Sequence, residues 1–98
     1  MKVIVLPPAR RDLDEAYSFY EEQSRGLGGY FVSSVLADFR VLSGTAGTHR
    51  RIYGAHRLLT RRFPYAIFYA VEDGVVSVLA VLDCRMDPRR MAERLRSS

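Results

Sequence analysis

A continuous apolar run in the second half of the sequence constrains the fold more than any other feature. Residues 67–71 are apolar at odd and at even positions alike. In an extended chain these positions point to opposite faces, so this pattern is expected of a strand that is covered on both faces. Proline cannot donate a ladder hydrogen bond, so Pro64 should stand at the start of this strand. The run therefore predicts the central strand of a sheet, with Arg61 and Arg62 at one rim.

A hairpin signal follows this strand. Asp73-Gly74 lies between two apolar runs, and this dipeptide is the strongest short signal for a tight β-hairpin. Residues 75–82 predict an antiparallel return strand that is again covered on both faces. Such a hairpin places residues 64–66 opposite residues 81–83. We therefore expect the two rim arginines to lie near Arg85, just beyond the return strand.

The segment before the central strand is basic. Residues 49–62 contain five arginines, two histidines and no acidic residue. An imperfect alternation over residues 55–62 predicts another strand, in which Arg57, Leu59 and Arg61 share one parity and both cations lie on one face. Three consecutive antiparallel strands result.

The first half of the chain predicts a short strand followed by a helix. Residues 3–6 are apolar and end at two prolines. Residues 9–24 carry apolar side chains at helical spacing, opposite a wet and mostly acidic face that includes Asp12. Tyr17 and Tyr20 are expected to point their rings at the core. Nothing in this helix demands catalytic chemistry.

A glycine-rich turn and a second helix come next. Gly26, Gly28 and Gly29 permit the tight reversal of a helical hairpin, and no strand precedes them as a phosphate-binding loop would require. Residues 29–43 form a helix whose apolar stripe is wider than one neighbouring helix can cover, so it should pack on the sheet and leave an apolar edge for a partner. The stripe consists of Phe31, Val32, Val35, Leu36, Phe39 and Leu42.

The C-terminal segment predicts a short basic helix. Asp87 is a suitable helix cap and Pro88 suits the first helical position. Arg89 and Arg90 stand near the helix N-terminus, where they gain nothing from the helix dipole. Their position is consistent with a role in binding a partner.

Charge is distributed unevenly between the two halves. Residues 1–48 carry a net charge of −1 and residues 49–98 a net charge of +5, and the basic half contains arginine but no lysine. Arginine binds phosphate and carboxylate groups in a two-pronged geometry, so a polyanion or an acidic protein partner fits this half. The alternative is that a net charge of +4 only keeps a small protein soluble.

Length and composition limit the remaining possibilities. We expect residues 1–98 to form one domain. No run approaches the ~20 apolar residues that cross a bilayer, and the N-terminus is too short for a signal peptide, so a cytoplasmic protein is expected. The one cysteine, Cys84, excludes an internal disulfide and a multi-cysteine metal site. It is expected to be a small buried side chain at a strand end, and no metal or cofactor is predicted.

The order of these elements and three short motifs resemble the RelE/ParE superfamily of toxins from bacterial type II toxin–antitoxin systems. The resemblance covers nearly the whole chain, and the motifs near residues 63 and 87 look more like the ParE branch than the RelE branch. Met91 is a departure, since many relatives place tryptophan there. The motifs are Ala9-x-x-Asp12-Leu13, Arg57-x-x-x-x-Arg62-Phe63-Pro64-Tyr65 and Arg85-x-Asp87-Pro88.

The resemblance implies a small α+β domain. Its expected order is an N-terminal strand, a helical hairpin, a three-stranded antiparallel meander and a basic C-terminal helix. It also implies a cognate antitoxin whose partly disordered segment wraps the helical hairpin and the sheet edge. Under this interpretation Tyr17, Val35, Phe39 and Leu42 are the candidate antitoxin-binding residues. The ParE branch is associated with blocking DNA gyrase and the RelE branch with cutting mRNA on the ribosome.

The two branches make different demands on the residues. An RNA-cleaving enzyme must activate a 2′-hydroxyl, stabilise a developing charge and protonate a leaving oxygen. Arg57, Arg61 and Arg85 could supply the charge. After Tyr69, however, the chain contains no tyrosine, histidine or lysine. His56, and His49 in the preceding loop, remain the histidine candidates for proton transfer.

We therefore favour a toxin that binds its target without catalysis. The alternative for Arg62 and Arg85 is a structural pairing with Asp87 or Asp83, and for the Tyr65 ring it is packing against the tail helix. Both views predict that the cations lie near one another. The candidate target-binding residues are Arg57, Arg61, Arg62, Tyr65, Arg85, Arg89 and Arg90.

Overall fold

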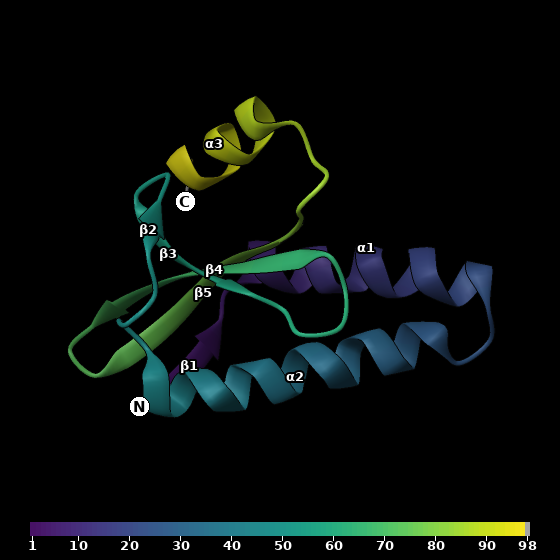
Figure 1. Ribbon diagram of the computed structural model, residues 1–98, viewed down its shortest axis with the longest axis horizontal. Helices are drawn as coiled ribbons and strands as arrows, with labels where there is room; N and C mark the ends of the chain where they lie inside the picture. The colour runs from purple at the N-terminus through teal and green to yellow at the C-terminus, as the bar shows by residue number, and fades with distance from the viewer. Residues whose placement is uncertain (98) are drawn as a thin grey trace.

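The computed structural model describes residues 1–97 and confirms the predicted α+β layout (Figure 1). The elements in chain order are β1 (Lys2–Val5), α1 (Pro7–Gln23), α2 (Leu27–Thr45), β2 (Arg51–Ile52), β3 (Ala55–Leu59), β4 (Tyr65–Glu72), β5 (Val75–Asp83) and α3 (Pro88–Arg96). The sheet has the strand order β1-β5-β4-β3-β2. β1 runs parallel to β5, and the other neighbours are antiparallel.

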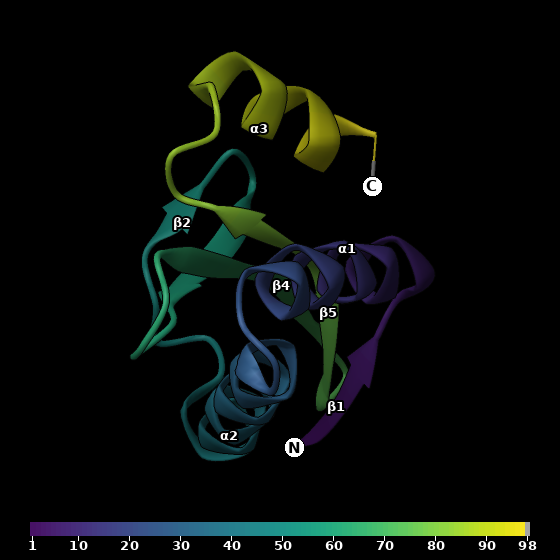
Figure 2. The same cartoon turned by 90° about the vertical axis from the view of Figure 1, so that its right-hand side faces the viewer.

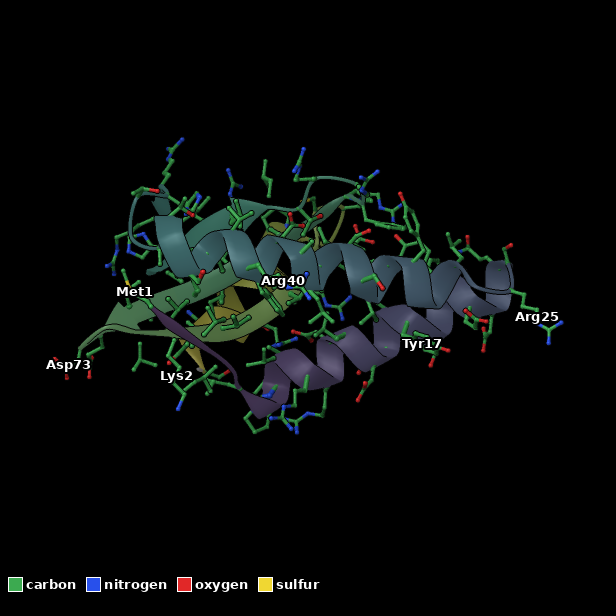
Figure 3. All side chains as sticks on the ribbon, turned by 90° about the horizontal axis from the view of Figure 1, so that it is seen from below. Met1, Lys2, Tyr17, Arg25, Arg40 and Asp73 are labelled. Carbon is green, nitrogen blue, oxygen red and sulfur yellow. The ribbon has the colours of Figure 1, made fainter. Side chains whose placement is uncertain are left out.

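Helices lie on both faces of the sheet. α1 and α2 lie side by side against one face (Figure 3), and α3 crosses the other (Figures 1 and 2). This arrangement explains why β4 is apolar at both parities, as predicted. Ile67 and Tyr69 pack with the helical hairpin, whereas Ala66 and Phe68 pack with Met91 of α3.

The predicted hairpin and its register are confirmed. Asp73 and Gly74 have φ angles of 51° and 75°, the left-handed values that a tight turn between twisted strands requires. Pro64 stands immediately before β4, and Tyr65 and Ala66 pair with Asp83 and Leu82. The end of β5 therefore lies beside the start of β4.

A bulge in β5 changes which face its side chains occupy. Phe68 pairs with Ala80 but Tyr69 pairs with Val78, which leaves Leu79 as an extra residue. Val78 and Val81 consequently both face the helical hairpin although they are three positions apart, a spacing that would place them on opposite faces of a regular strand. The bulge also turns a new set of backbone groups toward the outer edge of β5.

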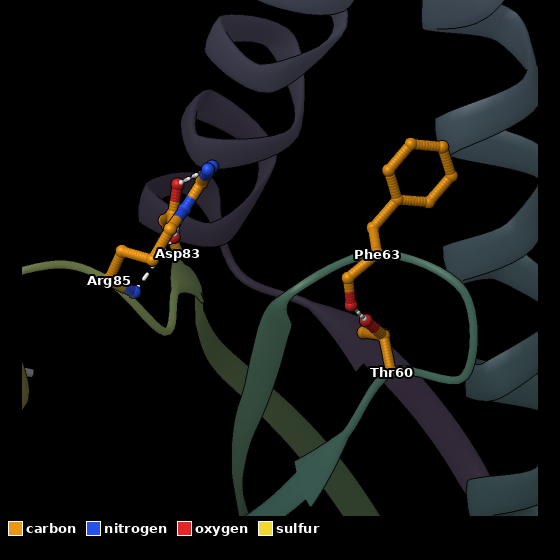
Figure 4. Close-up of polar contacts among 4 residues, drawn as sticks. All are labelled: Thr60, Phe63, Asp83 and Arg85. Atoms are coloured by element: carbon orange, nitrogen blue, oxygen red, sulfur yellow. Dashed lines mark hydrogen bonds and ion pairs between the residues drawn. The ribbon is translucent and has the colours of Figure 1, made fainter.

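The strand before Pro64 is shorter than predicted. β3 ends at Leu59, so the prediction that Arg61 shares a strand face with Arg57 is wrong. The chain turns instead, because Thr60 Oγ1 donates to the Phe63 carbonyl at 2.6 Å and Thr60 N donates to the Tyr65 carbonyl at 2.9 Å (Figure 4). The two-residue strand β2, which pairs with β3, was not predicted.

The helical hairpin is close to the prediction. α1 begins at Pro7, with its prolines in the first turn, and α2 begins at Leu27. The carboxylate of Glu21 accepts hydrogen bonds from Gly26 N and Gly28 N, both at 3.0 Å. Because the first amides of a helix have no partner within it, Glu21 acts as a cap for α2.

The C-terminal helix begins as predicted. Asp87 accepts a hydrogen bond from Arg89 N at 2.9 Å, and Pro88 follows it. The expectation of a buried Cys84 is wrong, because the turn after β5 leaves this residue exposed. Within residues 1–97, none of the helices is both long enough and apolar enough to span a bilayer.

Candidate functional site

Arg57 lies on the sheet face that α3 covers. It is half-buried in β3 and lines a cavity of about 170 Å³. The other lining residues are Tyr53, Ala66, Phe68, Cys84, Met86, Pro88 and Met91. Arg57 therefore borders a largely apolar cavity between the sheet and the start of α3.

Arg85 is held by Asp83 at the end of β5. Its Nε and Nη2 atoms donate to the two carboxylate oxygens at 2.9 and 2.7 Å, and its backbone N donates at 2.8 Å (Figure 4). These hydrogen bonds hold the pKa of Asp83 below its usual value. The Arg85 side chain is still 65% exposed, so it can also contact a partner.

Arg61 and Arg62 lie in the turn between β3 and β4, against α2. Arg61 N donates to the carboxylate of buried Asp38 at 3.4 Å. Burial raises the pKa of Asp38, while the Arg61 amide and the charges of the two arginines lower it. Arg62 Nη1 donates to the Tyr30 hydroxyl at 3.1 Å, and its guanidinium lies 5.9 Å from the centre of that ring. Its observed partner is thus Tyr30 rather than Asp83 or Asp87.

The cations fall into two groups around the start of β4. Arg57 and Cys84 line the same cavity, and Arg85 follows Cys84 in the chain. Partial burial raises the pKa of the Cys84 thiol, and the charges of Arg57 and Arg85 lower it. Arg61 and Arg62, in the turn before β4, instead lower the pKa of Asp38. We call these four residues the arginine surface: Arg57, Arg61, Arg62 and Arg85. Figure 4 shows the two chain segments that carry the turn and Arg85.

Tyr65 belongs to the core beside this surface. Its ring centre lies 4.9 Å from that of Phe31 and 6.2 Å from that of Tyr20, and burial, followed by Tyr20, raises the pKa of its hydroxyl. The expected packing against the tail helix is wrong, because Tyr65 shares the parity of Ile67 and Tyr69 and faces the helical hairpin.

Arg89 and Arg90 extend from the first turn of α3, and both are exposed. Arg89 Nε lies 3.9 Å from an Asp87 oxygen. At this distance and exposure the ion pair contributes little to stability. Both side chains can therefore contact a partner.

Both histidines contact Tyr69, and His56 lies on the sheet face opposite Arg57. His56 Nδ1 is 2.7 Å from the His49 carbonyl oxygen, and its ring stacks on that of Tyr69. A carbonyl only accepts, so Nδ1 of His56 carries the hydrogen. His56 and Arg57 are adjacent in β3 and so point to opposite faces.

Tyr69 lies in the central strand as predicted, but its hydroxyl has a structural role that the sequence did not reveal. Its hydroxyl accepts from Gly47 N at 3.0 Å and is hydrogen-bonded to His49 Nδ1. The ring is fully buried. It therefore fixes the loop after α2 to the centre of the sheet.

Three of the four candidate antitoxin-binding residues lie in the core. Val35 and Leu42 are 0% exposed and Phe39 is 6% exposed, while Tyr17 is 41% exposed. These three side chains pack on the sheet and cannot form surface contacts without unfolding. The helical hairpin exposes other large apolar side chains: Phe19, Tyr30, Leu36 and Val41.

An ion pair joins α1 to α3 and was not predicted. Arg94 donates from Nη1 and Nη2 to the two Asp12 oxygens at 2.8 and 2.7 Å, and Val81 N donates to Asp12 at 3.0 Å. The prediction that Asp12 lies on the solvent-exposed face of the first helix is therefore wrong. Its helical spacing from buried Ala9 and Ala16 was the signal that this side chain borders the core.

No metal site is formed by the described part of the chain. Within residues 1–97, no group of three or more histidine, cysteine, aspartate or glutamate side chains could hold a metal ion. The arrangement instead offers guanidinium groups and exposed aromatic rings, which bind carboxylates, phosphates and protein surfaces.

Comparison with known proteins decides the family. The sequence model described as "ParE toxin of type II toxin-antitoxin system, parDE" matches residues 3–88. This chain belongs to the ParE toxin family. No curated protein sequence matches it significantly.

Solved structures support the fold of this ParE-family chain. One, described as the chromosomal ParDE TA system from P. aeruginosa, is similar with a TM-score of 0.71 and 20% sequence identity. The match covers 83% of this chain and 92% of the other.

Proposed function

We propose that this ParE-family toxin is neutralised in the cytoplasm by a cognate antitoxin, and that it acts by binding and inhibiting DNA gyrase without catalysing a reaction. The antitoxin part of the proposal is supported by family membership and by the similar structure, which is described as a ParDE system. Inhibition of gyrase is associated with the ParE branch that the motifs resemble.

The placement of His56 is the observation that most supports binding over RNA cleavage. A ribonuclease of this superfamily needs a proton-transfer group near the cations that stabilise the phosphate. His56 stacks on Tyr69 and points to the sheet face opposite Arg57. Because His56 and Arg57 face opposite sides of the sheet, the arrangement favours binding of acidic groups over cleavage of RNA.

Two parallel assays on the purified toxin test this proposal. We expect loss of DNA supercoiling by gyrase and intact mRNA in a translating ribosome system with end-mapping. Codon-phased mRNA cuts with normal supercoiling would contradict it and support the ribosome-dependent endonuclease. The product of the adjacent gene should bind the toxin and restore supercoiling, and failure to do so would contradict the antitoxin part.

A further inference from the structure

Within the arginine surface, Arg62 combines a side chain that is held in place with an open hydrogen-bonding edge. Its Nη1 atom donates to the Tyr30 hydroxyl at 3.1 Å, and its guanidinium carbon lies 5.9 Å from the centre of the Tyr30 ring. Its Nε and Nη2 atoms donate to no protein atom within residues 1–97. These two donors form the edge of a guanidinium group that binds two oxygens of one acidic group in parallel.

The other three arginines of this surface lack one of these two properties. Arg85 directs its Nε and Nη2 atoms to the carboxylate of Asp83 at 2.9 and 2.7 Å, so its two-donor edge is occupied. The side chains of Arg57 and Arg61 form no hydrogen bond or ion pair in the described part of the chain. A side chain that is not held loses rotamer freedom when it binds a partner, which weakens binding. Arg62 is already oriented before the target arrives.

The chain around Arg62 is also fixed. The turn that carries it is closed by the hydrogen bond from Thr60 Oγ1 to the Phe63 carbonyl at 2.6 Å (Figure 4). The centre of the Phe63 ring lies 5.6 Å from that of Tyr30 and 5.1 Å from that of buried Phe31, and both contacts are T-shaped. The turn and the Tyr30 ring therefore form one packed unit that supports the Arg62 guanidinium.

Stability does not account for the contact between Tyr30 and Arg62. Tyr30 is 49% exposed and Arg62 is exposed, and contacts of a cation with a ring or a polar group contribute little to folding at such exposure. The effect of the contact is instead to set the direction of the guanidinium group.

We propose that Arg62 is the main anchor of the arginine surface, and that Tyr30 is a positioning residue that holds the Nε–Nη2 edge of Arg62 toward a carboxylate of the target protein. The inference rests on the proposed function, because it assigns part of the surface that binds gyrase. A carboxylate is favoured over a DNA phosphate because the edge lies beside an exposed aromatic ring. Arginine with an aromatic neighbour is typical of anchor residues in protein–protein interfaces.

Single substitutions of the arginines test the anchor. Arg62→Gln should raise the toxin concentration that half-inhibits supercoiling at least ~10-fold, whereas Arg61→Gln should raise it less than ~3-fold. Arg62→Lys keeps the charge but lacks a two-donor edge, so it should restore little of the loss. Full inhibition by Arg62→Lys, or an equal loss in Arg61→Gln, would overturn the proposal.

A double-mutant cycle tests the positioning role of Tyr30. Tyr30→Phe removes only the hydroxyl and should weaken inhibition roughly 3-fold, whereas Ser33→Ala, which removes an exposed hydroxyl from the same helix, should have no effect. In the Arg62→Gln background Tyr30→Phe should cause no further loss, because it acts through Arg62. No loss in the single variant, or losses that multiply in the double variant, would overturn the positioning role.

Nuclear magnetic resonance of the free toxin tests the same contact in the absence of the target. The order parameter of the Arg62 Nε–H group should fall in Tyr30→Phe and keep its wild-type value in Ser33→Ala. Equal order parameters in the three proteins would overturn the positioning role. Thermal unfolding of each variant checks that the fold is retained.

A binding measurement separates the carboxylate from a phosphate. Arg62→Gln should weaken binding to gyrase without DNA, and weakening only in the presence of DNA would assign the oxygens to phosphates and overturn the carboxylate. If the wild-type toxin did not inhibit gyrase, the proposed function and this inference would both fail. Inhibition by the wild type that Arg62→Gln leaves unchanged would overturn this inference alone.

Discussion

At the scale of single residues, Gly28 shows how closely the two long helices approach. A Cβ atom at this position would lie 2.6 Å from the Tyr17 carbonyl oxygen and 2.9 Å from Tyr17 Cδ2. Gly28→Ala should therefore lower the free energy of unfolding by about 1–3 kcal/mol, because the helices must separate. Urea unfolding measures this change.

Gly29 provides the matched control. It lies in the same helix, and a Cβ there would meet no atom within 4 Å. Gly29→Ala should therefore raise the free energy of unfolding by roughly 0.5–1 kcal/mol through reduced backbone entropy in the unfolded chain. If both alanines had the same effect, the close approach at Gly28 would not limit the helix packing.

At the scale of elements, an ion pair and an apolar face together hold α3 against the rest of the protein. Met91 and Leu95 pack on the sheet, and Arg94 binds Asp12 with side chains that are 34% and 9% exposed. Arg94→Met should lower the free energy of unfolding by about 1–3 kcal/mol, because the largely buried Asp12 carboxylate loses its cation. Chemical denaturation measures the loss.

Arg96→Met is the control on the same helix. Arg96 is exposed, so its replacement should change the free energy of unfolding by less than about 0.5 kcal/mol. Equal stability of the two variants would contradict a structural role for the ion pair.

The sequence predicted most elements because their signals are local. Each of these signals depends on a few neighbouring residues. Examples are the apolar run of β4, the Asp73-Gly74 turn and the start of the last helix at Asp87-Pro88. The Asp12–Arg94 ion pair joins residues that are 82 positions apart, and no local sequence pattern predicts it. The arginine surface was only partly predicted, because the turn at Thr60 ended β3 before Arg61.

At the scale of the whole molecule, the Asp83–Arg85 pair makes stability depend on pH. The pKa of Asp83 in the folded protein is below its usual value of 3.8, so its contribution is present above pH 3.8 and is lost as pH falls through the folded pKa. The wild type should be more stable than Asp83→Asn at pH 6, and this difference should shrink as the pH falls below 3.8.

Urea unfolding of both proteins at several pH values checks this expectation. Arg85 remains charged throughout this range, so the change reports the carboxylate. A difference in stability that stays constant from pH 6 to pH 2 would contradict the assignment.

The proposed action of this toxin is tested most directly by a titration of gyrase supercoiling with three proteins. They are the wild type, Arg61→Gln/Arg62→Gln and Arg10→Gln/Arg11→Gln, whose exposed adjacent arginines lie on α1. We predict that the wild type and the α1 variant inhibit supercoiling equally and that the Arg61/Arg62 variant needs at least ~10-fold more protein. Normal supercoiling with saturating wild-type toxin would contradict gyrase inhibition, and equal inhibition by all three proteins would contradict the role of Arg61 and Arg62 in the arginine surface.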